Sequence, residues 1–77
     1  MITVKKIHEI IENNCPQVDV SKIAPETRLR EYGIDSMDFF NIILELQDIL
    51  GKEIPDEDID QLRTVASIKD YFLKNAG

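Results

Sequence analysis

The 77 residues carry a net charge of −6 and 43% hydrophobic side chains, which suits one small domain and excludes a wholly disordered chain. The single cysteine excludes an internal disulfide, and together with the single histidine it supplies too few ligands for a structural zinc site. No apolar run reaches the roughly 18 residues of a membrane span, and the first residues lack the order of a signal peptide. We therefore expect one domain over residues 1–77, cytoplasmic and without stable membrane insertion.

The first predicted helix runs from Val4 to about Asn14. Thr3 is a favoured N-cap residue, and Pro16 ends the helix because it disfavours helical angles at the residue before it. The apolar residues at helical spacing are Val4, Ile7, Ile10 and Ile11. A long polar connection, residues 17–33, follows, and loops of that length in small domains are often functional. The side chains available to anchor it are Val20, Ile23, Leu29 and Tyr32.

The second predicted helix, residues 36–50, has the clearest start signal in the chain. Asp35 is a favoured N-cap residue, which makes Ser36 the first helical residue. Asp38 then occupies the third position, where a negative charge suits the helix dipole. A hydroxyl at this place is exposed, and a phosphate there would meet unsatisfied backbone N–H groups. The alternative is that Ser36 is merely a tolerated polar residue.

The boundaries and packing face of the second helix are also marked. Ile34 and Phe39 are spaced for a hydrophobic staple, Gly33 permits a positive φ before the helix, and Gly51 ends it. The predicted core-facing stripe consists of Phe40, Ile43, Leu46 and Leu50, widened by Phe39, Ile42 and Ile49. We expect this helix to be packed on its neighbours most fully.

Two further helices complete the predicted fold. Asp56, after Pro55, is a plausible N-cap for a short third helix, and Thr64 is a plausible N-cap for the last helix. The apolar residues of the last helix are Val65, Ile68 and Phe72, at i, i+3 and i+7. The alternation of strands is nowhere sustained. The prediction is an all-α four-helix bundle with three main helices, a short third one and a long first loop.

The negative charge is concentrated in the middle of the chain. Residues 35–61 contain nine of the fifteen acidic residues and a single basic residue, Lys52. This makes nucleic acid an improbable partner and favours a partner with a basic patch. A solvated acidic surface that only maintains solubility is the alternative.

The motifs of common enzymes are absent. Ser36 lacks the second glycine of a hydrolase elbow, and His8, the only histidine, lies among polar neighbours. Cys15 has no activating partner in the sequence and is interpreted as a packed thiol. We expect no catalytic residues, although a hydrolase pairing Ser36 with His8 stays open as an alternative.

An acidic cluster imitates the start of a calcium loop. Asp56, Asp58 and Asp60 have the alternating spacing, but Gln61 stands where the loop needs glycine and Ser67 where it needs glutamate. We expect no dedicated metal site.

Two segments carry a family resemblance. Residues 33–38 read Gly-Ile-Asp-Ser-Met-Asp and residues 53–58 read Glu-Ile-Pro-Asp-Glu-Asp, and together they resemble acyl carrier proteins over nearly the whole chain. The resemblance implies that Ser36 receives 4′-phosphopantetheine from coenzyme A through a separate magnesium-dependent phosphopantetheinyl transferase. It also implies a monomer that serves acyl-transferring, condensing or ligase enzymes with basic patches. The implied partner-recognition residues are Asp35, Met37, Asp38, Glu45, Asp48, Asp56 and Glu57.

The chain departs from the family pattern in ways that favour a specialised pathway. Met37 replaces the common leucine, and Asn41 and Gln47 replace acidic residues. Fatty-acid, polyketide, aminoacyl or lipid-modifying pathways stay open, as do a D-alanyl type of carrier and an unmodified acidic interaction domain. An acyl chain sheltered between helices, or simply a packed core, is expected around Phe40, Ile43, Leu46, Ile54, Ile59, Ile68 and Phe72.

Overall fold

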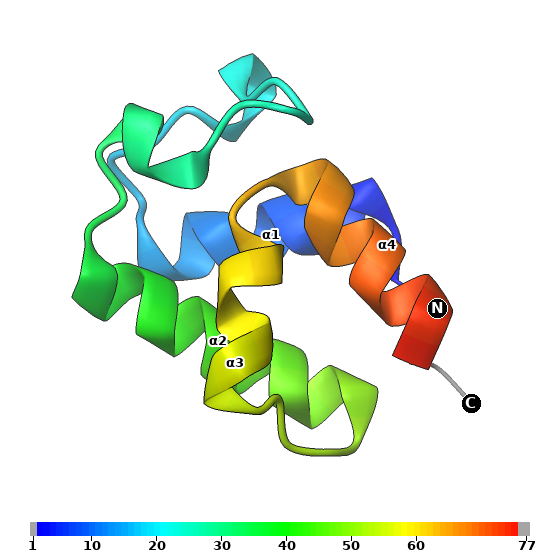
Figure 1. Cartoon of the computed structure of the whole chain (residues 1–77). Helices are drawn as coiled ribbons and strands as arrows, with labels where there is room; N and C mark the ends of the chain where they lie inside the picture. The colour runs from blue at the N-terminus through cyan, green and yellow to red at the C-terminus, as the bar shows by residue number, and fades with distance from the viewer. Residues whose placement is uncertain (1, 76–77) are drawn as a thin grey trace.

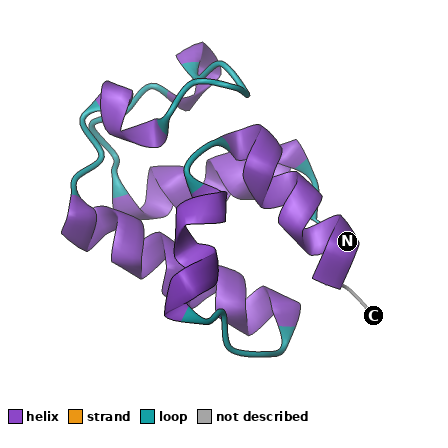
Figure 2. Cartoon of the chain, viewed as in Figure 1, coloured by secondary structure: helices purple, strands orange, loops and turns teal. Residues whose placement is uncertain are grey.

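The computed structural model describes residues 2–75, and these residues form helices and connecting loops without a strand (Figures 1 and 2). The α-helices are α1 (Val4–Asn14), α2 (Ser36–Leu50), α3 (Asp56–Ile59) and α4 (Val65–Asn75). The shorter 3₁₀ turns are η1 (Val20–Lys22), η2 (Leu29–Tyr32) and η3 (Asp60–Leu62). The prediction of an all-α bundle with three main helices and a short third one is confirmed.

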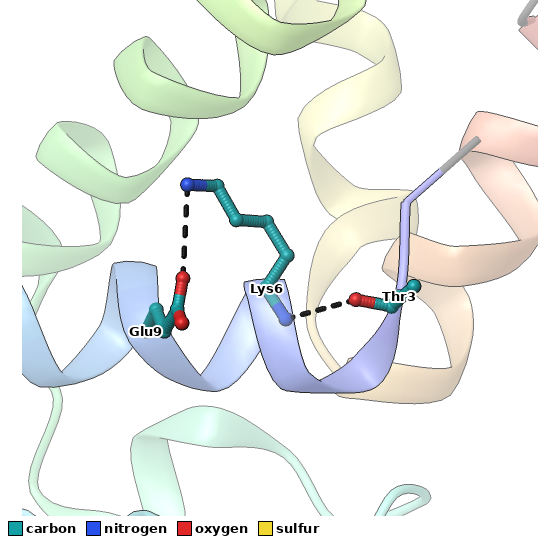
Figure 3. A network of polar contacts seen from close by, with 3 residues as sticks. All are labelled: Thr3, Lys6 and Glu9. Carbon is teal, nitrogen blue, oxygen red and sulfur yellow. Dashed lines mark hydrogen bonds and ion pairs between the residues drawn. The ribbon is translucent and has the colours of Figure 1, made fainter.

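Helix α1 begins at the predicted cap. The Thr3 hydroxyl oxygen accepts a hydrogen bond from the Lys6 backbone N–H at 3.1 Å, and the Lys6 ammonium lies 3.7 Å from the Glu9 carboxylate (Figure 3). This ion pair is exposed and contributes little stability, so the cap is the more important contact. The face of α1 that enters the core consists of Ile7, Ile10 and Ile11.

Helix α2 has the predicted boundaries but a narrower buried face than predicted. Its buried residues are Phe39, Ile42, Ile43 and Leu46. Phe40 is 55% exposed and Ile49 is 42% exposed, so their assignment to the core was wrong. The apolar side chains of α2 spread around more of the helix than its neighbours cover, so those at the edge of the stripe stay in solvent.

The last two helices show one wrong cap and one confirmed cap. Pro55, in an extended conformation, occupies the N-cap position of α3, and Asp56 is the first helical residue rather than the cap. Pro55 has no side chain that can accept a hydrogen bond, so the start of this short helix is uncapped. Thr64 caps α4: its hydroxyl oxygen accepts from the Ser67 N–H at 3.0 Å, while the Ser67 hydroxyl oxygen accepts from the Thr64 N–H at 3.0 Å.

The connection between α1 and α2 is fixed to the start of α4. Figure 1 shows it, in cyan to green, as an arc that leads from the end of α1 to the start of α2. The Leu29 N–H donates to the Arg63 carbonyl at 2.9 Å, and the Ala66 N–H donates to the Pro25 carbonyl at 2.9 Å. The buried anchors of the connection are Val18, Ile23 and Leu29, and the partly buried ones are Val20 and Tyr32. This otherwise irregular segment therefore has a defined position beside the N-terminus of α2.

Within the described range, no helix combines the length and apolar character that a bilayer crossing requires.

Candidate functional site

Ser36 is the first residue of α2, and its side chain is exposed. The Asp35 carboxylate caps the helix by accepting a hydrogen bond from the Asp38 N–H at 2.9 Å. Gly33 ends η2 with a φ of 86°, a left-handed conformation that favours glycine, and so turns the chain into the helix. The sequence therefore places the Ser36 hydroxyl at the tip of the longest helix.

Two buried residues bracket this helix start. Ile34, before the cap, is 4% exposed and Phe39, at the fourth helical position, is 9% exposed. Both belong to the buried core cluster, and both line the same pocket beside Ser36. The start of α2 is thus anchored in the core by these two side chains as well as capped by Asp35.

The helix tip suits a phosphate group. Helix geometry leaves the N–H groups of Ser36 and Met37 without an intrahelical acceptor, and the positive end of the helix dipole lies there. A phosphate esterified to the Ser36 oxygen would lie next to these N–H groups. The exposed position also allows another enzyme to reach the hydroxyl.

A pocket of about 280 Å³ opens beside Ser36. Its lining residues are Arg28, Leu29, Arg30, Ile34, Asp35, Ser36, Phe39 and Arg63. The arginines of this pocket were not predicted from the sequence. The alternation of arginines around Leu29 was visible in the sequence, but nothing local indicated that Arg63 lies beside them.

The predicted partner-recognition residues lie at the N-cap of α2, along α2 and on α3. Asp35, Met37 and Asp38 surround Ser36, Asp48 lies exposed farther along α2, and Asp56 and Glu57 are exposed in the first turn of α3. Glu45 differs from the others because it is partly buried and accepts a hydrogen bond from the Asn14 side chain on α1. Glu45 therefore links two helices in addition to carrying charge.

An exposed apolar stripe on α2 was not anticipated. Met37 is 76% exposed, Phe40 55% and Leu44 43%, and they follow one another at i, i+3 and i+7. The stripe begins at the residue after Ser36. The sequence did not indicate which apolar side chains of α2 are exposed, because apolar residues occur on several sides of this helix.

The residues predicted to surround an acyl chain are mostly part of the packed core. Ile43, Leu46, Ile54, Ile68 and Phe72 are buried in one cluster, and Ile59 is packed against it. Phe40 is the exception, since it lies outside. These positions agree with the simpler alternative of a packed core.

Cys15 is fully buried, and this burial, together with the nearby Asp38 charge, raises the pKa of its thiol to about 11. The thiol is therefore protonated and unreactive at neutral pH.

The acidic residues of α3 and η3 make other contacts. The Tyr71 hydroxyl donates to the Asp58 carboxylate at 2.8 Å, and the Arg63 guanidinium lies 2.7 Å from the Asp60 carboxylate. Among residues 2–75, no group of three or more potential ligands could hold a metal ion.

Comparison with known proteins identifies the family. The model of the family described as "Phosphopantetheine attachment site" matches residues 5–72. The chain is 41% identical over 71 residues to an acyl carrier protein of Syntrophobacter fumaroxidans, and the aligned region covers 91% of this chain and 86% of the relative. It is 38% identical over 72 residues to an acyl carrier protein of Rubrobacter xylanophilus, and the aligned region covers 92% of this chain and 88% of the relative.

The helical fold and these matches define a carrier protein that serves partner enzymes rather than an enzyme. The chain belongs to the acyl carrier protein family, and its prosthetic group is 4′-phosphopantetheine. This decides against the hydrolase that would pair Ser36 with His8. The residues around Ser36 fit the group, because they offer an exposed hydroxyl, free backbone N–H donors and cationic side chains.

Proposed function

We propose that Ser36 is the attachment residue of the 4′-phosphopantetheine arm, and that the protein carries acyl intermediates as thioesters on the thiol of that arm. The observation that supports this most directly is the exposed hydroxyl at the first position of α2, beside the Asp35 cap. When bound, the arm supplies a thiol on which an acyl group stays activated. Tethering raises the effective concentration of that group at each partner's active site.

Attachment exchanges a phosphoanhydride bond of coenzyme A for a phosphodiester bond to Ser36. The Ser36 oxygen forms a bond to the phosphorus that bears pantetheine in coenzyme A, and the pyrophosphate bond breaks. The hydroxyl proton is lost, and adenosine 3′,5′-bisphosphate leaves. The transferase supplies magnesium and the base for this step, while this chain supplies an accessible hydroxyl and the N–H groups of Ser36 and Met37 next to the new phosphodiester.

The partner-facing surface combines charge with an apolar stripe. We assign recognition to Asp35, Met37, Asp38, Glu45, Asp48, Asp56 and Glu57. Phe40 and Leu44 extend this surface, since they are exposed on α2 beside Met37. The acids steer basic partners and make the encounter fast and sensitive to salt, while the small apolar stripe adds contact area without making the complex permanent.

The pathway we propose is acyl-chain biosynthesis of the fatty-acid, polyketide or a related type, in a specialised branch. Asn41 and Gln47 support this branch, because they are uncharged residues where the family pattern has acids. The charge of α2 is therefore less negative than in that pattern. The Gln47 side chain has a structural task, since its carbonyl oxygen accepts a hydrogen bond from the Ile54 N–H at 2.9 Å and so fixes the loop before α3. A D-alanyl type of carrier is the second candidate, supported only by Met37.

Residues 1–77 are proposed to form one carrier domain that acts as a monomer in the cytoplasm and does not bind nucleic acid. The net charge of −6 supports the last statement, because it repels a phosphate backbone.

Loading in vitro tests the proposal. The protein is incubated with coenzyme A, magnesium and a promiscuous phosphopantetheinyl transferase, and its intact mass is then measured. Wild type and Ser21→Ala should gain the mass of one arm, whereas Ser36→Ala should gain nothing. An unmodified wild type would favour the acidic interaction domain instead.

A further inference from the structure

Three arginines gather beside Ser36 in a chain that is otherwise acidic. The arginine rim, defined as Arg28, Arg30 and Arg63, lines the 280 Å³ pocket together with Ser36. A second pocket of about 290 Å³ is lined by the same arginines and Asp60, so the rim extends beyond the first pocket. Five of the nine basic residues of the chain lie before Gly33, and the fold brings two of them next to Arg63.

The rim is held in place by its backbone and by contacts of Arg63. The hydrogen bond from the Leu29 N–H to the Arg63 carbonyl, at 2.9 Å, joins the two segments that carry the arginines. The Arg63 guanidinium carbon lies 5.0 Å from the centre of the Phe39 ring, and the same guanidinium pairs with Asp60 at 2.7 Å. Arg63 is therefore oriented before any ligand arrives, which lowers the entropy lost on binding.

The other two arginines have unused donors. Over residues 2–75, neither Arg28 nor Arg30 forms an ion pair with a carboxylate, and both side chains are exposed. The pocket lining carries three guanidinium groups against the single carboxylate of Asp35, so its net charge is positive and attracts an anion. Arginine also has the planar fork of donors that suits phosphate oxygens. The rim thus fits an anionic group with several oxygen atoms.

Part of the pocket lining is apolar. Leu29 is 2% exposed, Ile34 is 4% exposed and Phe39 is 9% exposed, and all three line the pocket together with the arginine rim. A ligand that fits both parts has an anionic group followed at once by a compact branched hydrocarbon. The proximal end of the 4′-phosphopantetheine arm has this chemistry, because its phosphate is followed by a gem-dimethyl group.

We propose that this pocket seats the proximal end of the arm, with the phosphate against the arginine rim and the gem-dimethyl group against Leu29, Ile34 and Phe39. This inference rests on the proposed attachment at Ser36, whose side chain lines the same pocket and so brings an esterified group to its edge. The base of the arm then has one preferred direction, while the thiol end stays free to reach partners.

The test compares the loaded and unloaded protein in matched variants. Arg28→Gln/Arg30→Gln removes two charges from the rim, and Lys5→Gln/Lys69→Gln removes two exposed charges from α1 and α4. Intact mass establishes that each sample is fully loaded, so a failure of loading at Ser36 is seen separately. In wild type and in the lysine variant, loading should raise the Tm by about 4 °C, whereas the rise should vanish in the arginine variant.

A second measurement does not depend on variants. In the loaded wild type, nuclear Overhauser effects should connect the gem-dimethyl protons of the arm to the Phe39 ring protons, and Arg28→Lys/Arg30→Lys should weaken them. A fully loaded protein without these effects, or with an equal rise in Tm in the arginine variant, would overturn the proposal. Arginine variants that lose only binding to an acidic partner enzyme, with the Tm rise intact, would overturn it as well.

Discussion

Arg63 lies over the ring of Phe39, with the guanidinium carbon 5.0 Å from the ring centre, and this contact joins the start of α4 to the first turns of α2. Phe39 follows Ser36 by three residues, so the helix tip that presents the hydroxyl is also packed against the last helix through this contact. The tip is therefore defined by tertiary packing as well as by its local cap.

The Asp35 cap should stabilise α2 through its hydrogen-bond acceptor rather than its charge. Asp35→Ala should lower the unfolding free energy by about 1 kcal/mol, because the Asp38 N–H loses its acceptor. Asp35→Asn keeps an acceptor oxygen and should stay near wild type. Urea unfolding followed by circular dichroism measures both. Equal losses in the two variants would contradict this account of the cap.

The adjacent residues Phe39 and Phe40 on α2 should contribute very differently to the free energy of unfolding. Phe39 is 9% exposed, so Phe39→Ala should lower the unfolding free energy by about 3 kcal/mol. Phe40 is 55% exposed, so Phe40→Ala should change it by less than about 0.5 kcal/mol but should slow transfer to partner enzymes. Chemical unfolding and a transfer assay with the loaded carrier measure the two effects. A large loss of stability in Phe40→Ala would show that this side chain belongs to the core.

The Tyr71 phenol should make the protein sensitive to alkali. Burial, and then the hydrogen bond to Asp58, raise the pKa of Tyr71 from 10.0 to about 12. Below pH 10 the phenol is protonated in both states, and its contribution to stability is complete. Between pH 10 and 12 the unfolded state loses the proton first, so the unfolding free energy falls.

Tyr71→Phe should remove the part of the alkaline fall in unfolding free energy that comes from this phenol. Urea unfolding measured from pH 8 upward should show a shallower decline in the variant than in wild type, while the contribution of Cys15 is common to both. At pH 8 the variant should be about 1 kcal/mol less stable, because Asp58 loses a hydrogen bond. Parallel pH profiles would exclude the raised Tyr71 pKa as a cause.

Cys15 should resist thiol reagents while the protein is folded. A thiol with a pKa of about 11 is only about 0.1% thiolate at pH 8, and full burial blocks access as well. Ellman's reagent should therefore react slowly with the native apo protein and rapidly in urea. In the loaded protein a second, accessible thiol on the arm should react at once, which distinguishes the two sulfurs.

Local chemistry explains which structural features could be predicted from the sequence. Thr3, Asp35 and Thr64 act through residues within one helical turn, and Gly51 ends α2 with a φ of 80°, so the sequence near each boundary contains the necessary information. Asp56 was wrongly predicted as the N-cap of α3, because Pro55 occupies the N-cap position and Asp56 is the first helical residue.

Long-range contacts explain what could not be predicted. The exposure of Phe40 depends on where the other helices pack, since the sequence of α2 is apolar on several sides. The arginine rim depends on the hydrogen bond between Leu29 and Arg63, which are far apart in the chain. Neither relationship has a local signature, so the pocket beside Ser36 became visible only in the folded structure.

Peptide mapping of the loaded protein tests the attachment residue most directly. Trypsin cleavage after Arg30 and Lys52 releases residues 31–52, a peptide in which Ser36 is the only serine and no threonine occurs. Tandem mass spectrometry should find the phosphopantetheinyl group on this peptide and assign it to Ser36. Finding the group on a peptide that contains Ser21 or Ser67, or on none, would contradict the account.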